Sequence, residues 1–495
     1  MKLGTFIASA LLGTVGSTTC PALVHATEAV VSASSDIQLY ELPDPYGTRE
    51  LRARRYTQTL GLRVFDLLDH GPTGTQLSFA GRLRLDPDFG QGGAERDPGR
   101  RDEYVPGLEE APVDLMYGYV EGSSLLGGWL VLRGGRQYHV DSLGWWSFDG
   151  GLARITTPTP LALELYGGME QRGGLPLLST SRFTADGVYR GSRRDLEVNQ
   201  WPSYLEEEKP APAYGFAIET VHTRWLQARL DYRRVTNRDI VYVTPFPERP
   251  DGFEVYRQER VSSERLGGSA VLTHDGLGSV AGSAVYDFLT GRVSEHAASL
   301  TWYATPPVSF TASYDYYLPT FDGDSIFNWF SHGGMTTARL EADWTLSRRM
   351  ELAGSVGGRT FAAQQGTDDG TAPTAPAEET DALGTMSGRY RWPRGSADLQ
   401  LVGEAGASGH RVGTDVTVRR VFVEGLYDTL AGVSLYDWAD ESRSYRNATS
   451  FTYFLGGGLH PNDASRVGIE WEHTTNDLVG QRFRLFATLE LEVWL

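Results

Sequence analysis

The sequence predicts an all-β fold, a transmembrane antiparallel up-and-down β-barrel of roughly 16–22 strands. Three observations support this prediction. Apolar and polar residues alternate from residue 56 to the C-terminus, as they do in strands with two unlike faces. The apolar rows mix Leu and Val with Gly and Ala, which lipid tolerates but which would leave holes in a close-packed soluble core. After the N-terminus, no stretch of convincing length repeats with the helical period.

The final stretch, residues 482–495, shows the alternation most clearly. Every second residue from Phe483 to Leu495 is apolar, whereas the intervening row includes Arg482, Glu490 and Glu492. Successive side chains of a strand point to opposite faces, and a tilted strand of this length crosses a bilayer. An edge strand of a soluble sandwich has the same pattern. Repetition of the pattern without a linker favours one closed sheet over several sandwiches.

The N-terminus predicts secretion. Lys2 is followed by a short apolar run over residues 3–15, and residues 24–26 offer small side chains to a signal peptidase. We therefore expect a signal peptide over residues 1–26. The single Cys, Cys20, lies inside it, so the mature chain is expected to lack disulfides, thiolate metal sites and cysteine nucleophiles. No metal or other cofactor is predicted.

The composition is compatible with a barrel and argues against nucleic acid as a partner. The formal net charge is −18, and the mean hydropathy is −0.32 although the fold is predicted to span a membrane. Strands hide only half of their residues from water, so a polar average is expected for such a barrel. The 58 glycines and the 11% aromatic content suit many turns and two interfacial girdles.

Beyond the signal peptide, we expect a short periplasmic lead-in over residues 27–55 and a barrel over residues 56–495. Residues 88–111 and 171–211 are expected to be long loops, the second of them either at the outer face or folded into the lumen. One point conflicts with this assignment. If the first strand begins at Tyr56, the loop at 88–111 falls at the end of the barrel where turns should be short.

Charged residues that alternate with apolar ones are the candidates for lining a pore. A charge on one face of a strand is costly in a protein core unless it is paired, but it suits a water-filled lumen. Positively and negatively charged candidates both occur, so strict selectivity for anions or for cations is not predicted. The alternation alone gives the candidates Arg82, Arg84, Arg229, Asp231, Arg233, Arg339, Glu341, Asp343, Glu470 and Glu472.

Residues 130–137, which end in Gly-Arg-Gln, are followed by a Phe-Asp-Gly within residues 147–151 and by an alternating stretch over residues 161–168. This order resembles a motif of porin-like and alginate-export-like outer-membrane barrels. The resemblance implies that Arg136 and Asp149 form a lumenal or structural pair, and both are added to the pore-lining candidates. Alternatively, Arg136 binds turn carbonyls near the rim. The chain departs from the family pattern because it ends in Leu495 and not in an aromatic residue.

These features predict a porin-like channel in the outer membrane of a Gram-negative bacterium, for passive or substrate-selective diffusion of small solutes. The expected partners are outer-membrane lipid, small solutes and the barrel-assembly machinery, and a homo-oligomer is left open. A closed barrel that acts in adhesion or export is the alternative. The chain is not expected to be an enzyme, because its histidines lack metal spacing and a Gly-x-Ser-x-Gly elbow is missing. A barrel hydrolase would need a spatial match such as His139 with Asp141.

Overall fold

The computed structural model describes the greater part of the chain. The described residues are 28–43, 50–67, 74–85, 113–170, 211–245, 253–319, 333–362, 379–406, 409–440, 447–478 and 480–494. The predicted signal peptide, most of the stretch 171–211 and Leu495 lie outside these residues.

The described residues form 22 strands in one sheet. The first half of the sheet comprises β1 (Glu28–Pro43), β2 (Glu50–Phe65), β3 (Gln76–Leu85), β4 (Val113–Ser124), β5 (Leu130–Asp141), β6 (Gly144–Thr156), β7 (Leu161–Glu170), β8 (Ala211–Thr220), β9 (Leu226–Pro245), β10 (Phe253–His274) and β11 (Gly278–Asp287). The second half comprises β12 (Arg292–Thr305), β13 (Val308–Tyr317), β14 (Met335–Ser347), β15 (Met350–Phe361), β16 (Glu379–Trp392), β17 (Gly395–Gly406), β18 (Gly409–Phe422), β19 (Tyr427–Asp440), β20 (Ala448–Asn462), β21 (Ser465–Asn476) and β22 (Gly480–Trp494). The short helical turns α2 (Leu125–Gly128) and η5 (Val423–Gly425) connect β4 to β5 and β18 to β19.

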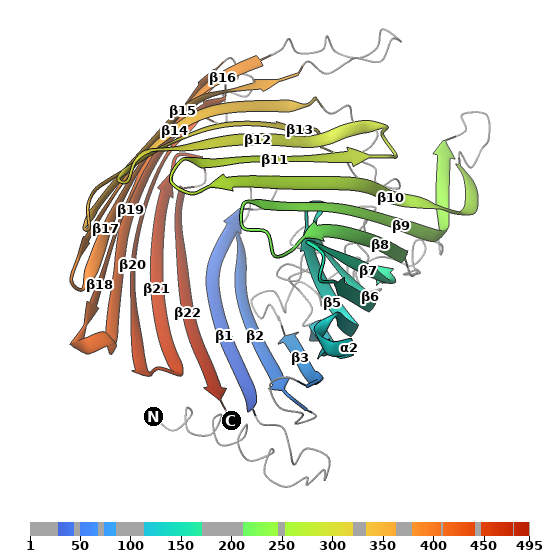
Figure 1. Cartoon of the computed structure of the whole chain (residues 1–495). Coiled ribbons are helices and arrows are strands. Elements are labelled where there is room, and N and C mark those ends of the chain that lie inside the picture. The colour runs from blue at the N-terminus through green and yellow to red at the C-terminus, as the bar shows by residue number, and fades with distance from the viewer. Residues whose placement is uncertain are drawn as a thin grey trace.

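The sheet is a closed antiparallel barrel. Each strand pairs with its neighbours in the sequence, and β1 pairs with β22, with Val30 opposite Trp494 and Asp36 opposite Thr488 (Figure 1). The prediction of an all-β up-and-down barrel is therefore confirmed, at the upper limit of the expected strand number. No helix among the described residues is long and apolar enough to cross a membrane.

The expected lead-in over residues 27–55 was wrong, because the barrel begins at Glu28. Residues Glu28–Pro43 form β1, and Glu50–Phe65 form β2, in register across the pair. The segment is rich in Ser and Ala, so its two faces differ little in polarity and the alternation is hard to detect. The extra strand also removes the conflict over the loop at 88–111. β3 ends and β4 begins at the end of the barrel opposite Glu28, and the loop expected at 88–111 itself lies outside the described residues.

Unlike a soluble protein, the barrel has apolar side chains on its exposed outer face and charged side chains on its inner face. In β7 the exposed row is Leu161, Leu163 and Leu165, whereas the covered row holds a charge: Leu165 is 45% exposed and Glu164 only 6%. Many other large apolar side chains on this face of the sheet are exposed, for example Leu340 and Val356. Apolar residues outside and charged residues inside are typical of membrane barrels.

Candidate functional site

The hairpin of β5 and β6 is longer than the strands on either side of it. β4 pairs with β5 only as far as Arg136, and β7 pairs with β6 only from Phe148 onward. Residues 137–148, here called the inward hairpin, pair with each other from Gln137 opposite Phe148 out to Asp141 opposite Gly144. Among the described residues, 137–147 have no other strand partner. With no partner on either side, this hairpin is free to leave the plane of the sheet.

Glycines let the sheet bend where the inward hairpin begins. A Cβ on Gly150 would lie 2.7 Å from the Cα of Gly168, and one on Gly135 would lie 2.8 Å from the Cα of Tyr119. Gly135 also has a φ of +130°, a conformation that side chains rarely adopt. The backbones approach on the face that carries Phe148, so this face is concave and is the inner face of the barrel. Glycine kinks of this kind are a known source of sheet curvature.

The inward hairpin packs across the inner face of the strands that follow it. Phe148 is fully buried and stacks on Trp146 with their ring centroids 4.3 Å apart. Both rings pack against Tyr166 of β7, and the same buried cluster includes Ala213 of β8 and Val235 of β9. The lumen therefore contains a small apolar core, which fixes the hairpin on what we call the covered wall, the inner face of β7–β10.

Arg229 of β9 is the centre of an ionic network on the covered wall. Its Nε donates to Asp231 (2.7 Å), its Nη1 to Glu219 of β8 (2.6 Å) and its Nη2 to Glu164 of β7 (2.9 Å). Arg154 of β6 also forms an ion pair with Glu219. The guanidinium thus joins carboxylates from three neighbouring strands, and its charge is compensated within the protein.

The tip of the inward hairpin is held by polar contacts as well as by the apolar cluster. Ser142 Oγ donates to Asp231 Oδ2 at 2.7 Å, and Arg233 donates to the carbonyl oxygen of Leu143 at 3.2 Å. The Arg233 guanidinium also lies 5.0 Å from the centre of the Trp146 ring. These contacts link the β5–β6 turn and Trp146 of β6 to β9, although neither β5 nor β6 pairs with β9 along the backbone. The hairpin is therefore anchored at its tip as well as at its base.

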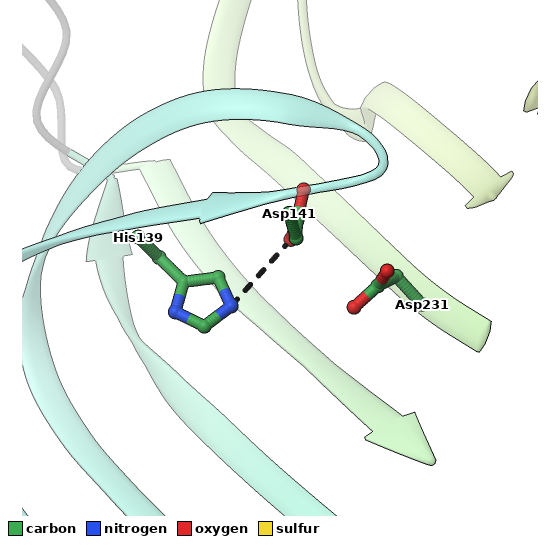
Figure 2. A group of neighbouring side chains, drawn as sticks. All are labelled: His139, Asp141 and Asp231. Carbon is green, nitrogen blue, oxygen red and sulfur yellow. Dashed lines mark ion pairs between the residues drawn. The ribbon is translucent and has the colours of Figure 1, made fainter. Parts of the chain in front are cut away.

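His139 lies within this network, between opposite charges. Its Nε2 is 3.3 Å from Glu164 Oε1, 3.7 Å from Asp141 Oδ2 and 3.2 Å from an Arg229 nitrogen. Figure 2 shows His139 and Asp141 on the arch of the hairpin, above the strand that carries Asp231. His139 and Asp141, the match that a barrel hydrolase would need, thus form a close pair.

The ligand atoms of His139, Asp141 and Asp231 lie within 4.8 Å of one another, close enough for a metal ion in principle. The donor set does not fit one. One oxygen of Asp231 accepts from Arg229 and the other from Ser142, and Arg229 also approaches the imidazole. A divalent cation would have to displace a guanidinium that already supplies the compensating positive charge.

The same residues do not form a hydrolytic site. A serine nucleophile requires a histidine within hydrogen-bonding distance as its base. Ser142, at the hairpin tip, donates instead to Asp231. The geometry of His139, Asp141 and Ser142 is that of a structural ionic network.

Arg136 and Asp149 form the pair that the family resemblance implied. Arg136 Nε and Nη2 donate to the two carboxylate oxygens of Asp149 at 2.8 and 2.9 Å, and Nη1 donates to the carbonyl of Leu115 at 3.1 Å. The ion pair is therefore present, whereas the carbonyl that Arg136 binds belongs to strand β4 and not to a turn. In the alternation of β6, Asp149 lies on the face opposite Phe148, so the pair does not belong to the network inside.

The other pore-lining candidates are dispersed around the barrel. Arg82 donates to Thr59, and Arg84 is buried on β3. Glu472 pairs with Arg484 at 3.3 Å. The remaining candidates, on β14 and β21, are exposed or half-buried: Arg339, Glu341, Asp343 and Glu470. Three members of the ionic network are not among the candidates predicted from the sequence: the carboxylates Glu164 and Glu219 and the arginine Arg154. Glu164 alone had a visible signal, an acid opposite the row of three leucines in β7.

The inner face of β13–β22, here called the open wall, has its ion pairs in contact with solvent. Arg391 pairs with Glu351 at 2.8 Å while these side chains are 49% and 40% exposed. Arg389 pairs with Asp398 and is similarly exposed. Among the described residues nothing packs on these pairs as the inward hairpin packs on the covered wall.

No family model and no curated protein sequence matches the chain. Several solved structures are similar to the chain. The Pseudomonas aeruginosa protein OccK1 (OpdK) is 8% identical, with a TM-score of 0.41 over 94% of this chain and 98% of its own. Acinetobacter baumannii OccAB4 is 6% identical, with a TM-score of 0.44 over 95% and 99%. The FrpB iron transporter from Neisseria meningitidis is 9% identical, with a TM-score of 0.48 over 94% and 82%.

Proposed function

We propose that this protein is a channel of the bacterial outer membrane, through which small solutes diffuse, and that the inward hairpin narrows its lumen. The observation that carries the proposal is the exposure of the ion pairs on the open wall. Charged side chains that are about half exposed on the inner face of a closed barrel require water inside it. The apolar outer row, exposed on strand after strand, supports insertion into lipid.

The hairpin supports a narrowed lumen because it occupies the inner face of β7–β10. Its buried aromatic pair and its contacts with Asp231 and Arg233 hold it on the wall. The space left for solutes therefore lies between the hairpin and the open wall. Solute size is expected to be limited at this level.

The test is single-channel conductance of the refolded protein in a planar bilayer. Stepwise currents are expected from the wild-type chain. A variant in which residues 138–147 are replaced by an Asn-Gly turn keeps the pair of Gln137 with Phe148 and should conduct more current per step. The matched control replaces residues 288–291, the turn between β11 and β12 at the same end of the barrel, and should leave the step size unchanged.

Insertion as heat-modifiable β-structure without current would contradict the proposal. It would favour the closed barrel that acts in adhesion or export. Equal conductance of the wild type and the hairpin variant would show that the hairpin does not limit the pore.

A further inference from the structure

Most arginines on the open wall are neutralised by carboxylates. Five ion pairs join strands of this wall at distances of up to 3.3 Å, four of them between neighbouring strands and one, Arg359–Glu404, from β15 across β16 to β17. The pairs are Arg359–Glu404, Arg389–Asp398, Arg391–Glu351, Arg419–Asp428 and Arg484–Glu472. Each pair contributes little net field at a distance, because its two charges nearly cancel.

Three carboxylates about halfway along their strands have no such partner. Glu341 of β14, Asp415 of β18 and Glu470 of β21 form no ion pair with any described residue. They lie on separate strands and do not form a cluster. At three points around the open wall, the described residues thus leave a carboxylate without a direct ion pair.

The residues directly opposite these carboxylates on the neighbouring strands are uncharged, including Gly456 and Phe486 opposite Glu470. Glu341 lies opposite Thr311 and Ser355, and Asp415 accepts hydrogen bonds from the hydroxyls of Ser434 and Tyr436. A hydroxyl that donates to a carboxylate stabilises its charged form but adds no positive charge.

Further hydroxyl pairs extend this neutral lining over the open wall and the adjacent strand β12. The pairs are Thr301–Thr311, Ser355–Thr385 and Thr452–Thr474. Short side chains of this kind leave room for water beside the charges.

Positive charge on the open wall does not balance this excess. Arg339 is exposed on the same face of β14 as Glu341, and Arg411 lies 5.0 Å from the centre of the Tyr436 ring. Asp315 and Asp343, also without an ion pair among the described residues, add negative charge on β13 and β14. The described inner face from β13 to β22 therefore has a net negative charge.

We infer that the open wall makes this channel prefer cations over anions, with Glu341, Asp415 and Glu470 as the determining residues. The inference rests on the proposed channel function. Uncompensated carboxylates in a narrow water-filled lumen raise the local concentration of cations and repel anions. The solute class that fits this wall is a small cation, and the hydroxyl lining offers it hydrogen bonds in place of lost water.

The experiment measures the reversal potential of the full-length mature channel across a potassium chloride gradient. The wild type is expected to give a potassium-to-chloride permeability ratio above one. The triple variant E341Q/D415N/E470Q should lower this ratio to one or below. The matched control R391Q/E351Q removes an ion pair without changing the net charge, and it should keep the wild-type ratio. Heat-modifiability on a gel establishes that each variant is folded.

The possible failures can be told apart. Absence of current from the folded wild type contradicts the channel function itself. Current with a ratio of one or below contradicts only the cation preference. A ratio that stays above one in the triple variant contradicts the assignment to these three carboxylates.

Discussion

The covered wall and the open wall of this barrel are built from the same residue types and differ in what lies on them. In both walls, inward-facing arginines and carboxylates alternate along each strand with outward-facing apolar residues. On the covered wall Asp231 is fully buried and Arg229 contacts three carboxylates, whereas on the open wall Arg391 is about half exposed. The difference is the inward hairpin, which excludes water from one wall only. A charge on a barrel strand thus becomes structural or solute-facing according to what covers it.

The energetic consequence is that equivalent substitutions should have unequal costs. A buried charge that loses its partner has neither water nor a counter-charge to stabilise it. An exposed charge that loses its partner is instead solvated by water, so little stability is lost. The comparison can therefore be tested by removing one carboxylate from each wall.

The largest effect is expected for Asp231→Asn on the covered wall. This change leaves the Arg229 guanidinium and the Ser142 hydroxyl facing an uncharged amide. Arg229 keeps its bonds to Glu164 and Glu219 but loses one charge-assisted hydrogen bond in a buried site. We therefore expect the free energy of unfolding to fall by about 3 kcal/mol, the upper end for a hydrogen bond to a charged group. Urea unfolding of the barrel in lipid vesicles, followed by tryptophan fluorescence, measures it.

The matched variant on the open wall is Asp398→Asn, which breaks the exposed pair with Arg389. Its expected cost is about 0–1 kcal/mol. Equal losses in the two variants would mean that the hairpin does not exclude water from the covered wall.

A smaller effect is expected where the sheet bends toward the covered wall. Gly150→Ala would place a methyl group 2.7 Å from the Gly168 Cα, so the backbones must separate and the bend must open. We expect a cost of about 1–3 kcal/mol, as for overpacked sites. Gly354→Ala in β15 is the control, since its Cβ would meet the Thr385 carbonyl at 3.6 Å, an ordinary contact. A stable Gly150→Ala barrel with an unchanged hairpin would show that the bend does not depend on this glycine.

The alternation of the sequence predicted the composition of each wall but not the difference between them. It placed Arg229, Asp231 and Arg233 on one face, and that face is the inner one. The contact that buries them joins Ser142 to Asp231, which are 89 residues apart in the chain. Such a contact exists only after β6–β9 have formed a curved wall, and no local pattern encodes it.

The first strand escaped prediction for a different reason. β1 has Ser32 and Ser34 on its inner face and Ala33 and Ser35 on its outer face, so its polarity alternates too weakly to be recognised. Its pairing with β2 and β22 nevertheless supplies the backbone hydrogen bonds that close the barrel. Closure, and not local propensity, gives this segment its conformation.

The last prediction is that conductance does not change when the inward hairpin is fixed covalently to the covered wall. Ser142 Oγ lies 2.5 Å from the position that a Cβ on Gly267 of β10 would occupy, so Ser142→Cys with Gly267→Cys should form a disulfide on oxidation. Cys20, the single natural cysteine, lies in the predicted signal peptide and does not compete. Because the apolar cluster and the bond from Arg233 to the Leu143 carbonyl hold the hairpin in place without the Ser142 hydroxyl, oxidised and reduced channels should show the same step size. A step that grows on reduction would mean that the hairpin leaves the wall, and the covered wall would then be a second solute-facing surface instead of a structural one.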